Sequence, residues 1–166
     1  MNKEKEPLRR FGSLAVVIGP DGHFVFFNSH VENGDKLDWN GERFRSVSDN
    51  LEMISGANNK SSFNQEDFIS TLVRETSEER GVTISPDQIS DRIGWSATCQ
   101  QRDGEAVAFD ISVHTMRLTQ EQLDEISRSG STITLISKEE VLKALDNNQS
   151  AFRPSVIKAI EMVLQN

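Results

Sequence analysis

The chain has 166 residues, of which 36% are hydrophobic and 27% are charged, and this composition is typical of a globular protein of one domain. Its formal net charge of −8 argues against non-specific nucleic-acid binding, which depends on a basic surface. A single cysteine excludes an internal disulfide, no apolar run is long enough to span a bilayer, and residues 1–6 lack the apolar run of a signal peptide. We therefore expect a cytoplasmic protein without a membrane segment.

The first third of the chain is predicted to form hairpins. Residues 13–18 and 23–27 indicate a buried strand and its return, joined by a turn at residues 20–22. A second hairpin is expected over residues 36–45, because the Asn-Gly pair at its centre suits a type I′ turn. A short strand is expected over residues 51–54.

The middle of the chain is predicted to contain one helix and two longer strands. Apolar residues recur with helical spacing from about residue 64 to residue 80, and Gly81 follows as a residue that commonly ends a helix. Residues 85–88 indicate a capped helical turn. The two strands are expected over residues 95–100 and 106–116.

The last third is predicted to alternate between helices and one strand. Thr119 and Gln122 form a capping-box pattern at the start of a helix of about ten residues. A strand is expected over residues 132–136, Ser137 caps a further helix, and Pro154 begins an amphipathic C-terminal helix.

Strands and helices are thus interspersed along the whole chain. This order predicts an α/β or α+β protein with a mixed sheet that is flanked by helices. Residues 1–10 are expected to be an N-terminal extension, and residues 11–166 a single domain.

Three glutamates in the first predicted helix, Glu75, Glu78 and Glu79, are spaced at i, i+3 and i+4 and therefore share one side of that helix. Their charges repel one another, and the negative end of the helix dipole disfavours them further. Mg2+ and Mn2+ prefer carboxylate oxygen, so a bound divalent ion would explain the cluster. Such an ion would also let this acidic protein bind a phosphorylated molecule. The plain alternative is a solvated helix face.

Arg74 stands directly before Glu75 and eight residues after Glu66. A guanidinium group can hold a carboxylate through two hydrogen bonds, so Arg74 is expected to keep the cluster in its geometry. The alternative for Arg74 is an ordinary surface ion pair.

The segment from Glu66 to Val82 resembles the Nudix box, whose signature is G-x5-E-x7-R-E-U-x-E-E-x-G-U, where U is a bulky aliphatic residue. The matching residues are Glu66, Arg74, Glu75, Glu78, Glu79, Gly81 and Val82. Two positions depart from it: Lys60 stands where the first glycine is expected, and Thr76 replaces an aliphatic residue. Gly56-Ala57 resembles the glycine pair of that family, displaced by an insertion of about three residues.

The resemblance implies the α/β/α sandwich of Nudix hydrolases and Mg2+- or Mn2+-dependent cleavage of a diphosphate bond in a nucleoside diphosphate linked to another group. It implies Glu78 and Glu79 as the main metal ligands, and Glu75 as a further ligand or as the base that prepares water. Glu66 and Arg74 would support the site. A homodimer is common in the family.

The resemblance also points to ligands outside the glutamate cluster. The carbonyl of Ala57 would be a further ligand, and Glu105 and Asp110 are candidates for an additional carboxylate, against a structural or merely exposed role for each. Two other functions remain open. One is a nucleotide-binding module without turnover, and the other is an acidic protein-interaction domain without a ligand.

Overall fold

The computed structural model describes residues 8–28, 51–58, 65–102, 105–147, 152 and 154–165. The strands are β1 (Leu8–Ile18), β2 (Phe24–Asn28), β3 (Leu51–Glu52), β4 (Ile54–Asn58), β5 (Gly94–Arg102), β6 (Glu105–Arg117) and β7 (Ile133–Ile136). The helices are α1 (Gln65–Arg80), the 3-10 turn η1 (Pro86–Gln88), α2 (Gln120–Arg128), α3 (Lys138–Asn147) and α4 (Pro154–Gln165).

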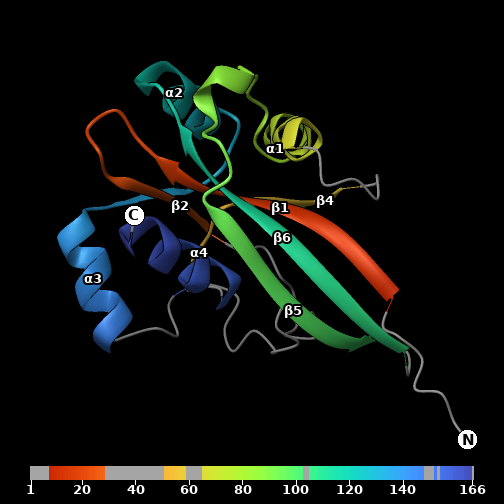
Figure 1. Cartoon of the computed structure of the whole chain (residues 1–166). Helices are drawn as coiled ribbons and strands as arrows, with labels where there is room; N and C mark the ends of the chain where they lie inside the picture. Colours follow the sequence, from red (N-terminus) through yellow and green to blue (C-terminus); the bar gives the residue numbers. More distant parts are fainter. Residues whose placement is uncertain are drawn as a thin grey trace, which may run out of the picture.

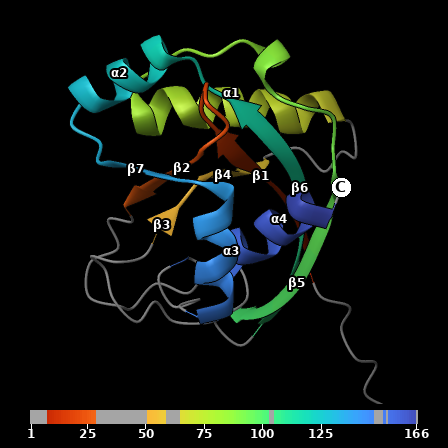
Figure 2. The ribbon, with the colours of Figure 1, turned by 90° about the vertical axis from the view of Figure 1, so that its left-hand side faces the viewer.

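The strands form one mixed sheet with the order β3-β2-β1-β6-β5 (Figure 1). β4 pairs with β1, and β7 pairs with β2. β1 and β6 run parallel, whereas the other named pairs are antiparallel. Figure 2 shows α1 and α2 on one face of this sheet and α3 and α4 on the other. The predicted class, a mixed sheet flanked by helices, is confirmed.

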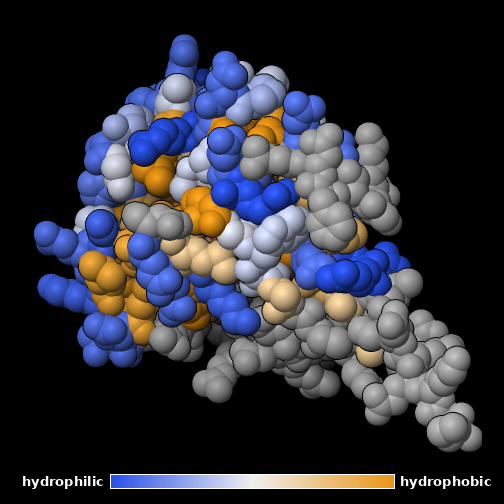
Figure 3. All heavy atoms as spheres, viewed as in Figure 1, coloured by the Kyte–Doolittle hydropathy of each residue, from blue (hydrophilic) through white to orange (hydrophobic). Residues whose placement is uncertain are grey.

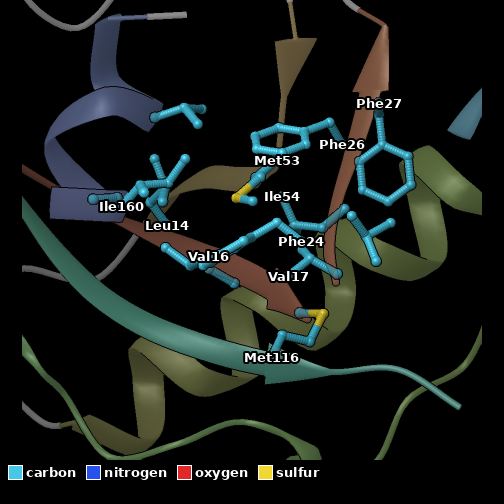
Figure 4. Close-up of a cluster of buried hydrophobic side chains, with 14 of the residues drawn as sticks. Leu14, Val16, Val17, Phe24, Phe26, Phe27, Met53, Ile54, Met116 and Ile160 are labelled. Carbon is cyan, nitrogen blue, oxygen red and sulfur yellow. The ribbon is translucent and has the colours of Figure 1, made fainter. Parts of the chain in front are cut away.

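The core lies on both faces of β1, because this central strand is covered by helices on each side. Leu14, Val16 and Val17 are all buried. In Figure 4, Leu14 lies next to Ile160 of α4, and the same hydrophobic core continues through the aromatic residues of β2. On the opposite face, the hydroxyl of Ser13 donates a hydrogen bond of 3.0 Å to the carbonyl of Phe68, which ties β1 to α1.

The predicted helix ends agree with the structure. Gly81 follows α1 with a φ of 70°, in the left-handed region that favours glycine. Thr119 and Gln122 form the predicted capping box at the start of α2, and Ser85 caps η1 in the same way. The hydroxyl of Ser137 accepts a hydrogen bond from the backbone N–H of Glu140 at the start of α3.

The largest differences between the strand boundaries and the sequence-based expectation occur at β1 and at β3–β4. β1 begins at Leu8 rather than at residue 13, because its first residues pair with β6; residues 8–10 of the expected extension therefore lie in the sheet. The strand expected over residues 51–54 is interrupted at Met53 and continues as β4 to Asn58. The expected hairpin over residues 36–45 and Lys60 lie outside the described residues.

The face of the molecule seen in Figure 3 mixes hydrophilic and hydrophobic residues. In the described part of the chain, the large hydrophobic side chains that are exposed are Trp95, Leu135 and Leu142. None of the helices in the described ranges has the length and apolar character that a bilayer-spanning helix requires.

Candidate metal centre on helix α1

Helix α1 presents its glutamates beside its buried side chains. Phe68 and Leu72 are fully buried. Glu75 follows Leu72 by three residues, and Glu79 follows Glu75 by four. All four therefore point from the same side of the helix. The side chain of Glu75 is consequently only 17% exposed, whereas that of Glu78, on the flank, is 62% exposed.

Glu75 lies directly over the backbone of Gly56 in β4. A Cβ atom at position 56 would stand 2.6 Å from Cδ and 2.8 Å from Oε1 of Glu75, distances at which something must move. Gly56 therefore leaves a space that the side chain of Glu75 fills. This contact joins α1 to β4 at the place where the sequence suggests a displaced glycine pair.

Arg74 contacts the neighbouring groups through its guanidinium. Its Nη2 donates to the carbonyl of Ala57 and to Oε1 of Glu75, each at 3.3 Å. Its Nε lies 3.9 Å from Oε1 of Glu78. Arg74 therefore bridges β4 and two of the three glutamates, which is the arrangement expected for a residue that keeps the cluster in place.

The carboxyl group of Glu79 has a strongly raised pKa. Partial burial of the carboxyl, followed by a hydrogen bond and charge repulsion from Glu75, raises the pKa of Glu79 to about 7 from an ordinary value of 4.5. Glu79 as a whole residue is exposed. We therefore attribute its raised pKa to partial burial of the carboxyl group itself and to the neighbouring Glu75. The hydrogen bond and the charge of Glu75 therefore act directly on the carboxyl group of Glu79.

A fourth carboxylate, which the sequence patterns did not indicate, lies next to this pair. Glu52 in β3 accepts a hydrogen bond of 2.8 Å from Nη2 of Arg80, the last residue of α1. The charge of Glu52 raises the pKa of Glu79, and the charge of Arg80 lowers it. The two-residue strand that carries Glu52 has no recognisable sequence pattern, and the burial of its partner Arg80 is seen only in the folded chain.

The remaining predicted residues lie elsewhere. Glu66 is in the first turn of α1, nine residues before Glu75, which is about 13 Å along a helix axis. Asp110, on β6, forms an ion pair of 3.1 Å with Arg9 of β1. Glu105 is the first residue of β6, and its side chain is outside the described part of the structure.

The donor chemistry of the cluster fits a hard divalent ion. Glu75 places its carboxylate over the bare backbone of Gly56, and Glu78 and Glu79 follow one helical turn later, so all three can offer the carboxylate oxygens that such ions prefer. As the side chains stand, no three acidic, histidine or cysteine residues within the described residues are arranged to hold a metal ion. Arg74 occupies the Glu75 carboxylate and the Ala57 carbonyl in this arrangement.

The chain resembles solved structures in its fold. It matches the E. coli ORF135 protein at 14% identity and a TM-score of 0.54, covering 96% of this chain and 91% of that one. It matches a NUDIX hydrolase from Nitrosomonas europaea at 16% identity and a TM-score of 0.51, covering 95% and 89%. No protein-family model and no curated protein matches the chain. At these identities the likeness shows the fold alone, which is that of Nudix hydrolases.

Proposed function

We propose that this chain is a metal-dependent hydrolase that cleaves a diphosphate bond in a nucleoside diphosphate linked to another group. The observation that carries this proposal is the carboxylate of Glu75, which lies over the bare backbone of Gly56 and close enough to Glu79 to raise the pKa of that carboxyl group. The Nudix hydrolase fold and the match of α1 to the Nudix signature support it.

Each glutamate of α1, together with Arg74, would have its own role in this reaction. Glu78 and Glu79 would hold Mg2+ or Mn2+, and Glu75 would be a further ligand or the base that accepts a proton from water. Arg74 would orient Glu75 and Glu78 through the contacts described above. A bound divalent ion would neutralise diphosphate oxygens and make water a better nucleophile.

The proposal can be tested with a panel of nucleoside diphosphate derivatives, assayed with Mg2+ or Mn2+ and then with EDTA. At least one compound should release a nucleoside monophosphate or a phosphorylated fragment, and EDTA should abolish the release. Glu78→Gln should reduce turnover by about 100-fold or more while barely changing the melting temperature, because this side chain is exposed. Glu139→Gln, an equal charge change on α3, is the matched control. Normal turnover in Glu78→Gln would remove the glutamate cluster from the mechanism.

A second candidate function is nucleotide binding without turnover. Arg74 favours it, because this residue occupies both the Glu75 carboxylate and the Ala57 carbonyl, two groups that a metal ion would need. Calorimetry distinguishes the two functions: tight binding of a nucleotide without formation of product supports the binding module. The absence of any Mn2+-induced thermal stabilisation would instead favour an interaction domain without a ligand.

A further inference from the structure

His114 on β6 is fully buried, and each of its ring nitrogens lies at hydrogen-bond distance from a partner. Nδ1 is 2.9 Å from the carbonyl oxygen of Ser90, and Nε2 is 2.7 Å from the hydroxyl oxygen of Ser112. A carbonyl oxygen can only accept, so Nδ1 carries the proton of the neutral ring and Nε2 is the acceptor. The Ser112 hydroxyl therefore donates its proton to His114.

The same hydroxyl oxygen accepts a hydrogen bond of 2.7 Å from Nε of Arg92. Arg92 is thus bonded to a hydroxyl whose own proton is directed to His114. Its guanidinium also lies over two aromatic rings, with Cζ 4.0 Å from the ring centroid of Trp95 and 5.2 Å from that of Phe68 in α1. The Arg92 side chain therefore links the buried imidazole to an aromatic pair at the start of α1.

Protonation of the imidazole changes this network at one atom. Nε2 of an imidazolium is a donor, so the Ser112 oxygen would have to accept from two cations while its own proton loses its acceptor. Both positive groups would then lie 2.7 Å from one fully buried oxygen, where little water screens their repulsion. His114 is enclosed in the sheet, whereas Arg92 is partly exposed, so Arg92 is the cation that can leave.

The backbone on either side of Arg92 is held by bonds that protonation does not alter. The N–H groups of Ser90 and Ile93 donate to carbonyl oxygens of β6, at 2.9 Å and 2.8 Å. The movement is therefore confined to the Arg92 side chain. Trp95, which is already 36% exposed, would lose the guanidinium that covers its ring.

The charged groups that act on the imidazole, in the part of the chain that the structure describes, are Arg92 and Asp91. Burial lowers the pKa of His114 and the charge of Arg92 lowers it further, whereas the hydrogen bond to Ser90 and the charge of Asp91 raise it. Ala15, which lies opposite His114 on β1, is uncharged. Protonation is therefore expected below pH 6.5, the ordinary value of a histidine.

We propose that His114, Ser112 and Arg92 form a pH-sensitive switch: when His114 takes up a proton, the Arg92 side chain leaves Ser112 and withdraws from Trp95. The same movement separates the guanidinium from Phe68, and so from the start of the helix that carries the glutamates. This inference is independent of the proposed function, because it concerns a different group of residues and needs no metal ion.

Acrylamide quenching of Trp95 fluorescence, followed from pH 7.5 to pH 5, tests the switch. Trp39→Phe leaves Trp95 as the single tryptophan and serves as the parent protein. Its quenching constant should rise by about twofold on acidification, because the departing guanidinium uncovers the indole ring. Circular dichroism over the same range follows the fold, and a loss of the helical signal together with the rise would overturn a switch confined to one side chain.

Two further variants of the parent assign the rise to its cause. His114→Gln cannot gain a charge and should keep the low quenching constant throughout, whereas Ser112→Ala lacks the shared hydroxyl and should show the high constant throughout. His23→Gln changes an exposed histidine in a turn and is the matched control, with the response of the parent.

A constant that does not change with pH in the parent, or a rise in His114→Gln equal to that of the parent, would overturn the inference. If His114→Gln does not fold, Ser112→Ala decides. A high constant that is independent of pH in Ser112→Ala supports the switch, and a rise like that of the parent overturns it.

Discussion

The side chain of Glu75 occupies the space that a side chain at Gly56 would need. Oε1 of Glu75 would stand 2.8 Å from a Cβ atom at position 56, and Cδ would stand 2.6 Å away. A residue from the middle of α1 and a residue of β4 thus depend on each other for their conformations. This contact places the carboxyl group beside β4 and next to Glu79, so the geometry of the cluster depends on the glycine.

Gly56→Ala should therefore impair the site more than the fold. The new methyl group must displace the Glu75 side chain, which is flexible, so we expect a loss of stability of about 1 kcal/mol or less but weaker Mn2+ binding and lower turnover. Urea unfolding and Mn2+ titration measure the two effects. Gly19→Ala is the matched control, because a Cβ there would make only ordinary contacts, of 3.5 Å or more. Equal Mn2+ affinity in the two variants would contradict the importance of the Gly56 contact.

Arg74→Met should lower turnover by about 10- to 100-fold, because Glu75 and Glu78 lose the guanidinium that orients them. The melting temperature should change little, since the Arg74 side chain is 42% exposed. Arg74→Lys should recover only part of the activity, because an ammonium group cannot reproduce the planar fork. Steady-state kinetics separates these cases, with the exposed Arg128→Met as a control. Full activity in Arg74→Met would assign Arg74 to a surface ion pair.

The raised pKa of Glu79 predicts a pH dependence of both stability and metal binding. Between about pH 4.5 and pH 7, the folded protein holds a proton on this carboxyl that the unfolded chain has released. The retained proton stabilises the folded protein relative to the unfolded chain, and this stabilisation is lost as the pH rises through about 7. A cation must displace the same proton, so Mn2+ should raise the melting temperature more at pH 8 than at pH 6. Thermal melts of the protein and of Glu79→Gln check this; a Mn2+ effect that is equal at both pH values would contradict it.

His114 should give a pH dependence of the opposite sign. It is fully buried, and burial lowers its pKa below the ordinary value of 6.5. Below pH 6.5 the unfolded chain therefore binds a proton more readily than the folded protein, and stability should fall on acidification. His114→Leu should lose this component of the pH dependence, which urea unfolding at pH 5 and pH 7 would measure. An unchanged dependence in the variant would assign it to other groups.

The same variant should also be less stable at neutral pH. Nε2 of His114 lies 2.7 Å from the hydroxyl of Ser112, and Nδ1 lies 2.9 Å from the carbonyl of Ser90. Arg92 donates to the same hydroxyl from Nε at 2.7 Å, so that the hydroxyl proton is directed to His114. Leucine would remove both hydrogen bonds of the imidazole from a buried site, and we expect a loss of about 1 to 3 kcal/mol. A variant as stable as the original protein would show that the network is dispensable.

Local patterns in the sequence were sufficient for the helices and for most strands. Helical spacing, the Thr119 capping box and Gly81 each act over a few residues, so the boundaries of α1 and α2 follow from neighbours in the chain. The class of the fold follows in turn from the order of these elements.

The pairing of distant segments could not be predicted in the same way. The parallel alignment of β1 with β6 joins residues about 100 positions apart, and it is this alignment that extends β1 back to Leu8. The Glu52–Arg80 pair is likewise separated by 28 residues and depends on a strand of two residues. For the site, the sequence indicated Glu75 and Glu79, but the contact of Glu75 with Gly56 and the partner of Asp110 are properties of the folded chain.

The proposed function depends above all on a divalent cation held by the glutamates of α1. The most direct measurement is the anomalous scattering of a crystal soaked in Mn2+. We predict an anomalous peak bound by the carboxylate of Glu79 together with Glu75 or Glu78, with Arg74 withdrawn from the oxygen that it contacts here. A Mn2+-soaked crystal without a peak beside this turn of α1, and with Arg74 still bonded to Glu75, would contradict this assignment.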